Sequence, residues 1–176
     1  MPTVRSKNTV CKLPGMHARA AELIATLGLR PHPEGGYYVE VFRSPMSVRP
    51  DDGRAPRAAL TTIYFLLTAG DCSRWHRVAS DEVWHHLEGA PLDLFVAEPR
   101  FSAVTQLALG AAAGHVRPVQ VVAAMRWQAA QSTGEYTLAS CAVGPGFAFA
   151  DFAMLDEGSD DAAEMRRLHP DLARFI

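Results

Sequence analysis

Residues 70–89 read GDCSRWHRVASDEVWHHLEG, a stretch between two glycines that holds His76, then Glu82, then two adjacent His. Glu82 follows His76 by six residues, and His85 and His86 come soon after it. The runs on both sides are rich in β-branched and aromatic residues, which favour strands. Imidazoles and carboxylates serve acid–base chemistry and metal binding in proteins. This stretch is therefore the first candidate for a functional site.

Length and composition predict one ordinary globular domain. The chain has 176 residues, of which 48% are hydrophobic and 20% are charged, as in typical globular domains. We expect a flexible leader at residues 1–16 and a single domain at residues 17–176. No apolar run approaches the roughly 20 residues that cross a bilayer, and the first residues lack the apolar core of a signal peptide. We therefore predict a cytoplasmic protein without a membrane partner.

Charge and cysteine content exclude several other classes of protein. The formal net charge of −2 and the pI near 6.4 provide no basic surface for phosphates, so we expect no nucleic-acid partner. The three cysteines, Cys11, Cys72 and Cys141, are odd in number and lack Cys-x-x-Cys spacing. They predict neither a disulfide framework nor a thiolate zinc site.

The hydrophobic pattern predicts a β body between two helices. Apolar residues recur at helical spacing over residues 17–27, and Gly28 follows as a C-terminal cap. A second helix is expected after Asp161, limited by Pro170. Between them, short apolar runs predict strands at residues 37–42, 60–67, 83–87, 92–96, 104–109, 116–122, 136–143 and 147–149. Many short strands at close spacing are typical of a sandwich or barrel.

The spacing of the central stretch resembles the first signature of the cupin superfamily. Gly70, His76, Glu82 and Gly89 stand in register with it, and Val78 occupies the place of its second His. Residues 33–38 (PEGGYY), 81–85 (DEVWH) and 145–152 (PGFAFADF) resemble one branch of small cupins, most of which have no assigned function. The resemblance runs from about residue 23 to 155. It implies an all-β, double-stranded β-helix (jelly roll) with a small-molecule pocket in the barrel.

Strand alternation places Glu82, Trp84 and His86 on one side and Val83, His85 and Leu87 on the other. In one interpretation the first trio faces the barrel interior beside His76. In the other, Val83 and Leu87 enter the core and the trio lies on the surface. The cupin resemblance, in which the Glu faces inward, favours the first.

The resemblance also bears on metal binding. Cupin metal sites typically use three His and one Glu, and the chain's closest match to the second signature, residues 123–128, has Gln128 in place of the ligand His. His76, Glu82 and His86 could still hold a divalent metal weakly, as two imidazoles and a carboxylate do elsewhere. Without metal, His76 and Glu82 would form an acid–base pair, or only a structural hydrogen bond.

Several other residues could bind a ligand. By alternation, Arg74 lies on the same face as His76, where its guanidinium would favour a carboxylate or phosphate; a solvated edge position is the alternative. Tyr64 could supply a phenol or pack in the core, and Glu34 could face the lumen or stabilise its turn. The candidate ligand-binding residues are Glu34, Tyr64, Ser73, Arg74, Trp84 and Gln128.

Two functions remain open at this point. The first is an enzyme that performs acid–base chemistry on a small polar metabolite, as epimerases, isomerases and lyases with this barrel do. The second is a non-catalytic barrel that binds or senses a small ligand.

Both faces of the strand at residues 37–42 carry apolar side chains, so one face needs a partner, and we expect a two-fold homodimer.

Overall fold

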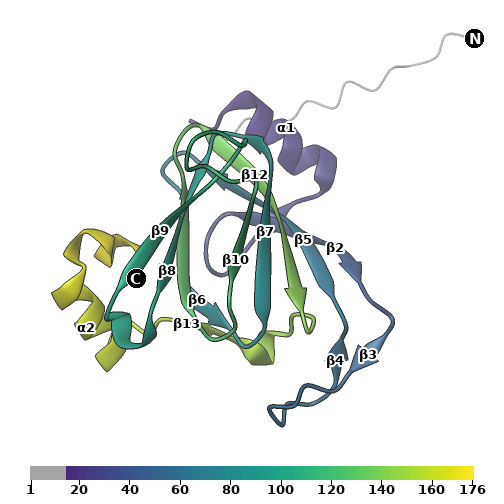
Figure 1. Cartoon of the computed structure of the whole chain (residues 1–176). Coiled ribbons are helices and arrows are strands. Elements are labelled where there is room, and N and C mark those ends of the chain that lie inside the picture. Colours follow the sequence, from purple (N-terminus) through teal and green to yellow (C-terminus); the bar gives the residue numbers. More distant parts are fainter. Residues whose placement is uncertain (1–14) are drawn as a thin grey trace, which may run out of the picture.

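The computed structural model describes residues 15–176, so most of the expected leader lies outside the described residues. Two antiparallel sheets form the body (Figure 1). The first sheet has the order β1 (Arg30–Pro31), β2 (Tyr37–Arg43), β5 (Thr61–Thr68), β12 (Tyr136–Gly144), β7 (Asp81–Gly89), β10 (Val119–Val122). The second has the order β13 (Phe152–Met154), β6 (Cys72–Val78), β11 (Trp127–Ser132), β8 (Leu92–Ala97), β9 (Val104–Leu109). The predicted all-β jelly roll is confirmed.

The space between the sheets is apolar at one end. Phe65 and Trp84 meet edge to face with ring centroids 5.7 Å apart, and Leu92, Leu94 and Leu109 fill the volume beside them. All five side chains are almost completely buried. This packing closes one end of the barrel and leaves the polar side chains at the other.

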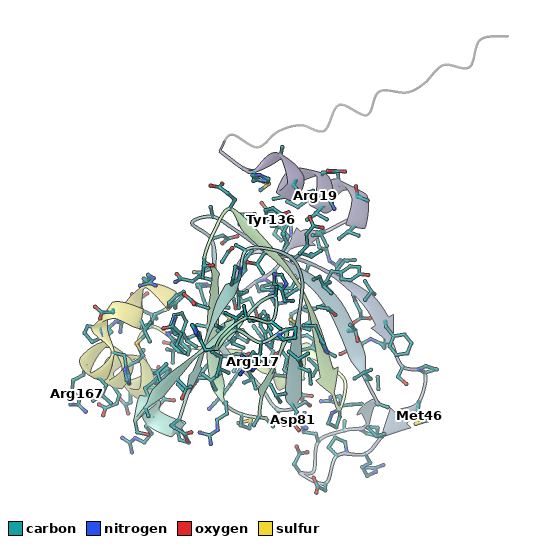
Figure 2. The ribbon with its side chains drawn as sticks, turned by 45° about the horizontal axis from the view of Figure 1, so that its top comes forward. Arg19, Met46, Asp81, Arg117, Tyr136 and Arg167 are labelled. Carbon is teal, nitrogen blue, oxygen red and sulfur yellow. The ribbon has the colours of Figure 1, made fainter. Side chains whose placement is uncertain are left out.

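Two helices cover the outer faces of the sheets. α1 (Ala18–Leu27) ends at Gly28, which adopts the left-handed conformation expected of a C-terminal cap. Arg19 of α1 donates to Glu88 at 2.7 Å, and the hydroxyl of Tyr136 donates to the same carboxylate at 2.8 Å; Figure 2 shows Arg19 and Tyr136 at the same end of the molecule. α1 is therefore anchored to the first sheet by an ion pair as well as by apolar packing.

The second sheet is covered by the C-terminal segment. α2 (Asp160–Leu168) and the 3₁₀ helix η3 (Pro170–Phe175) bury Met165 and Phe175 against Trp75. The Trp75 indole also donates to the backbone carbonyl of Leu172 at 3.3 Å. No helix within residues 15–176 is long and apolar enough to cross a membrane.

The strands of the structure differ from the predicted ones at several places, and two of these concern the second sheet and the segment that leads into it. Residues 149–151 form the 3₁₀ helix η2 (Phe149–Asp151) followed by β13, so the predicted strand at 147–149 is wrong. Strand β11 was not predicted, because its WQAAQS sequence has little β-propensity. It forms nonetheless because β6 and β8 pair with it on both sides.

The long loop before β5 is partly ordered as a hairpin. β3 (Ser47–Val48) pairs with β4 (Arg57–Ala58), and Figure 1 shows the hairpin projecting away from the barrel. Arg57 forms two hydrogen bonds with Asp151, of 2.7 and 2.8 Å, and Arg54 adds one of 3.0 Å. The hairpin is thus held to the segment between β12 and β13.

Candidate functional site

A cavity of about 290 Å³ opens at the polar end of the barrel. It is lined by charged, polar and aromatic side chains that come mainly from the first sheet, from β6 and from the segment before β13. The lining residues include Arg30, His32, Glu34, Tyr38, Glu40, Arg43, Phe65, His76, Val78, Glu82, Trp84, Cys141, Val143, Phe147 and Phe152. His76, Glu82, Trp84 and Glu34, all predicted to be site residues, thus share one cavity.

A β-bulge in β6 decides which of its side chains face inward. His76 pairs with Gln128 and Ser73 pairs with Ala130, so three steps along β6 oppose two steps along β11. The extra residue reverses the alternation. Ser73 and His76 are therefore both buried in the barrel, while Arg74 is exposed.

The prediction that Arg74 shares the face of His76 is wrong for this reason. Its guanidinium donates to the backbone carbonyl of Pro33 at 2.9 Å, and it does not line the cavity.

Glu34 reaches the cavity because its turn lies directly against the start of β6. The backbone N–H of Arg74 donates to the Glu34 carbonyl at 2.9 Å, and the N–H of Gly36 donates to Asp71 at 3.1 Å. A Cβ on Gly35 would lie 2.0 Å from the carbonyl oxygen of Cys72, and φ is +114° there. Only glycine fits such a position, so the glycine pair is what allows the Glu34 side chain to enter.

Glu34 and His76 are direct partners. His76 Nδ1 lies 2.8 Å from the carbonyl oxygen of Arg74, and since a carbonyl can only accept, Nδ1 carries a hydrogen. His76 Nε2 lies 3.3 Å from Glu34 Oε2, and Ser73 donates to Glu34 Oε1 at 2.8 Å. The free ring nitrogen of His76 therefore faces the Glu34 carboxyl, whereas the expected hydrogen-bonded partner was Glu82.

Glu82 belongs to a second set of hydrogen bonds. The amide of Gln128 donates to Glu82 Oε2 at 2.6 Å, and the Trp84 indole donates to Gln128 Oε1 at 3.1 Å. The Cys141 thiol lies beside the same carboxyl as a further hydrogen-bond partner. The orientation of Gln128 is fixed from both sides, so it acts as a bridge between Glu82 and the indole.

Burial controls the protonation of this cluster. Desolvation raises the pKa of Glu34 to about 8 and also raises the pKa of Glu82. It lowers the pKa of His32 to about 4 and the pKa of His76 as well. At neutral pH, Glu34 is mainly a carboxylic acid and His76 a neutral imidazole, so their contact joins two neutral groups and is not an ion pair.

Four predicted site residues besides Arg74 do not line the cavity. Ser73 and Gln128 are buried behind it and bond to the lining residues Glu34 and Glu82, whereas His86 and Tyr64 lie elsewhere. His86 Nε2 is 3.2 Å from the carbonyl oxygen of Gly89 and 3.3 Å from that of Ala90, and neither His85 nor His86 lines the cavity. The apolar packing around Trp84 closes the barrel before His86 is reached. Tyr64 packs on the outer face in the cluster beneath α1. The placement of His86 and Tyr64 in the pocket is therefore wrong.

The predicted metal-binding set is not assembled. His86 is outside the cavity, Val78 presents an apolar side chain to it, and one Glu82 oxygen already accepts from Gln128. Among residues 15–176, no group of three or more His, Cys, Asp or Glu side chains has an arrangement that could hold a metal ion. These residues do not fit a resident metal.

Several cavity residues were missed by the sequence analysis. His32, Tyr38 and Cys141 line the cavity, and the His32 ring meets Tyr38 edge to face at 4.5 Å. The sequence signal for Tyr38 was strand alternation, which groups it with Glu40, another residue of the cavity lining. His32 and Cys141 gave no such signal, because only the fold brings them to the cavity.

Comparison with known proteins agrees with this architecture. No curated protein matches the sequence. A hypothetical protein from Leishmania major is 33% identical, with a TM-score of 0.74 over 88% of this chain and 94% of its own. A protein from Shewanella oneidensis is 28% identical, also with a TM-score of 0.74, over 87% and 91%.

A more distant match concerns the fold alone. The oxalate decarboxylase of Bacillus subtilis is 13% identical, with a TM-score of 0.53 over 71% of this chain and 29% of its own. The family model described as Cupin superfamily (DUF985) matches residues 21–155, which is most of the chain. The chain therefore belongs to this family of the cupin superfamily.

Proposed function

We propose that this protein is an enzyme that moves a proton on a small polar metabolite, as epimerases, isomerases and lyases do. The observation that carries the proposal is the 3.3 Å contact between His76 Nε2 and Glu34 Oε2 on the wall of a cavity. A neutral imidazole is a proton acceptor and a protonated carboxyl is a proton donor. The two groups a proton transfer needs thus stand side by side at neutral pH.

The surroundings of the pair support this role. The hydrogen bond from Nδ1 to the Arg74 carbonyl holds the imidazole and leaves Nε2 as the reactive nitrogen. The ring of Phe152 lies against His76 at 5.4 Å, and Trp84 and Phe65 form an apolar wall. Apolar walls exclude water, which strengthens the electrostatic interactions of the acid and the base. A volume of about 290 Å³ suits a small metabolite.

The proposal is tested by hydrogen exchange in D₂O. The protein is incubated with a panel of small 2-oxo acids, 2-hydroxy acids and aldoses, and deuterium incorporation at carbon is followed by NMR. We expect catalysed exchange in at least one compound. His76→Asn keeps a donor toward the Arg74 carbonyl but removes Nε2, so it should slow exchange by about 10²- to 10⁴-fold. Glu34→Gln should have a comparable effect.

Matched controls come from exposed residues. His115→Asn and Glu135→Gln make the same chemical changes outside the cavity and should leave the exchange rate unchanged. Equal rates for the wild type, His76→Asn and Glu34→Gln would rule out the proposed pair.

A non-catalytic binding barrel is the second candidate function. It is favoured by Val78, an apolar residue that lines the cavity at the place where cupins carry a His. In that case a compound from the panel would bind, as detected by chemical-shift changes at His76, and show no exchange at carbon.

A further inference from the structure

A second β-bulge changes which residues of β2 face the cavity. Glu40 pairs with Ile63 and Phe42 pairs with Thr62, so Val41 is an extra residue in the ladder between β2 and β5. Unbroken alternation would place Phe42 beside Tyr38 and Glu40. With the bulge, Arg43 lines the cavity and Phe42 is 48% exposed. Bulges near sites commonly redirect a side chain in this way.

Arg43 is held in place at the cavity mouth. Its Nε and one terminal nitrogen donate to Glu40 at 3.0 and 2.6 Å, and its other terminal nitrogen donates to the backbone carbonyl of Phe147 at 3.2 Å. A guanidinium carries five N–H donors in a rigid plane, so donors remain beyond these three. Arg43 can therefore bind an anion without leaving its partners.

Arg30 adds a second guanidinium to the same mouth. It stands opposite Tyr38 in the β1–β2 pairing, and its guanidinium carbon lies 5.0 Å from the centre of the Tyr38 ring. Within residues 15–176 no carboxylate forms an ion pair with it. Arg30 and Arg43 both line the cavity, and Glu40 balances only one of them.

We infer that the ligand of this cavity carries an anionic group, a carboxylate or a phosphate, which Arg30 and Arg43 bind at the mouth while its uncharged polar part reaches Glu34 and His76. This inference rests on the proposed function, from which it takes a small metabolite as the ligand, and it adds the chemical class of that metabolite. Carboxylate and phosphate groups each accept several hydrogen bonds at once, and the planar guanidinium group of an arginine can donate two of them in parallel. The uncharged part suits the interior because a buried charge without a partner is costly there.

The test uses three probes of the same carbon skeleton: glycerol 3-phosphate, glycerate and glycerol. Binding to the full-length protein is followed by NMR through the Nε–H signals of the arginine side chains and the backbone amides around the cavity. We expect glycerol 3-phosphate or glycerate to shift the Arg30 and Arg43 signals and to bind at least about tenfold more tightly than glycerol. The stronger of the two identifies the anion as phosphate or carboxylate.

Three substitutions have effects of different sign. Arg30→Gln and Arg43→Gln should each weaken binding of the anionic probe by about tenfold and leave glycerol unchanged. Glu40→Gln removes the competing carboxylate, so binding of the anion should become tighter. A purely structural role of these residues would not reverse the sign. Arg49→Gln, which changes an exposed arginine outside the cavity lining, is the matched control. If Arg43→Gln does not fold, the anion affinities of Arg30→Gln and Glu40→Gln still test the inference.

Three results would overturn the inference. The three probes could bind with equal affinity, neither anion could bind, or the folded arginine variants could bind the anion as tightly as the wild type. Failure of the proposed function is seen separately. If an anionic probe binds through Arg30 and Arg43 but no compound in the D₂O panel exchanges hydrogen, the substrate-class inference stands for a binding protein and the proton-transfer proposal fails.

Discussion

The side-chain amide of Gln128, on β11 of one sheet, donates a hydrogen bond of 2.6 Å to the carboxyl of Glu82, on β7 of the other. Both residues are buried, with Gln128 1% and Glu82 6% exposed. The bond therefore crosses the interior of the barrel and occupies a carboxyl oxygen that a metal would need. Gln128 stands where the cupin resemblance places a ligand His, so this chain uses that position for a hydrogen bond.

If the Glu82 carboxyl, which lines the cavity, serves function, Glu82→Gln is expected to abolish ligand binding or activity with little change in stability. The new amide can still accept from Gln128 through its oxygen, so we expect the free energy of unfolding at pH 7 to change by no more than about 1 kcal/mol. Urea denaturation and the exchange or binding assay measure the two effects. Large destabilisation with intact function would show that the carboxyl is structural.

Glu34→Gln should change the pH dependence of stability. The folded pKa of Glu34 is about 8, above its usual value near 4.5. The folded state therefore holds an extra proton in this interval, and the contribution of Glu34 to stability falls as pH rises from about 4.5 to 8. Gln remains neutral throughout, so the variant should gain up to a few kcal/mol relative to the wild type over this range. Urea denaturation of both proteins at several pH values measures this gain. If the free energy of unfolding depends on pH in the same way for the variant and the wild type, the prediction is wrong.

Any divalent metal should be bound weakly, because Val78 and Gln128 are not ligands of the cupin type and His86 is outside the cavity. Dialysis against a chelator followed by elemental analysis should leave no stoichiometric metal. The double substitution Val78→His with Gln128→His adds two imidazoles and should raise the affinity for Zn²⁺ or Mn²⁺. Stoichiometric metal that survives chelation of the wild-type protein would prove this prediction wrong.

Asp151→Asn should release the β3–β4 hairpin. The Asp151 side chain is 4% exposed and bonded to both Arg54 and Arg57, whose hydrogen bonds lower its pKa. Loss of the charge leaves the partly buried Arg57 guanidinium without a carboxylate partner, while Arg54 keeps its ion pair with Asp52, and we expect a cost of about 2–4 kcal/mol. Amide hydrogen exchange at residues 47–58 should accelerate. Asp156→Asn is the matched control, and equal exchange in both variants would contradict the proposed anchor.

The protein is expected to form a two-fold homodimer of twice 19.1 kDa. β1 pairs only with Tyr37 and Tyr38, so no strand among residues 15–176 pairs with that edge of the remainder of β2, and Val41 and Phe42 are 45% and 48% exposed. Pairing of this edge with a second copy would satisfy its backbone groups and cover the apolar side chains. Light scattering at micromolar concentration checks the mass. A monomer would show that the edge needs no partner.

Local pattern was sufficient for the β body, for the two flanking helices and for the shared face of Glu82 and Trp84; the cupin resemblance was needed to turn that face inward. Each depends on a period of two or 3.6 residues, or on a cap such as Gly28, and these signals act between neighbours in the chain. The cupin spacing added the connection between His76 and Glu82. It suggested that the two were partners because both stand in register with the cupin signature.

Tertiary structure decided the partner of His76 and the shape of the cavity. Glu34 is 42 positions away in sequence from His76 yet contacts it, because the Gly35–Gly36 turn lies against β6. The bulge in β6 reverses the alternation that placed Arg74 inward, and the bulge in β2 turns Arg43 toward the cavity where an unbroken strand would turn Phe42. A bulge forms where two residues of one strand lie opposite a single residue of the neighbouring strand. Its position therefore depends on how the two strands pair and cannot be read from the sequence of one strand alone.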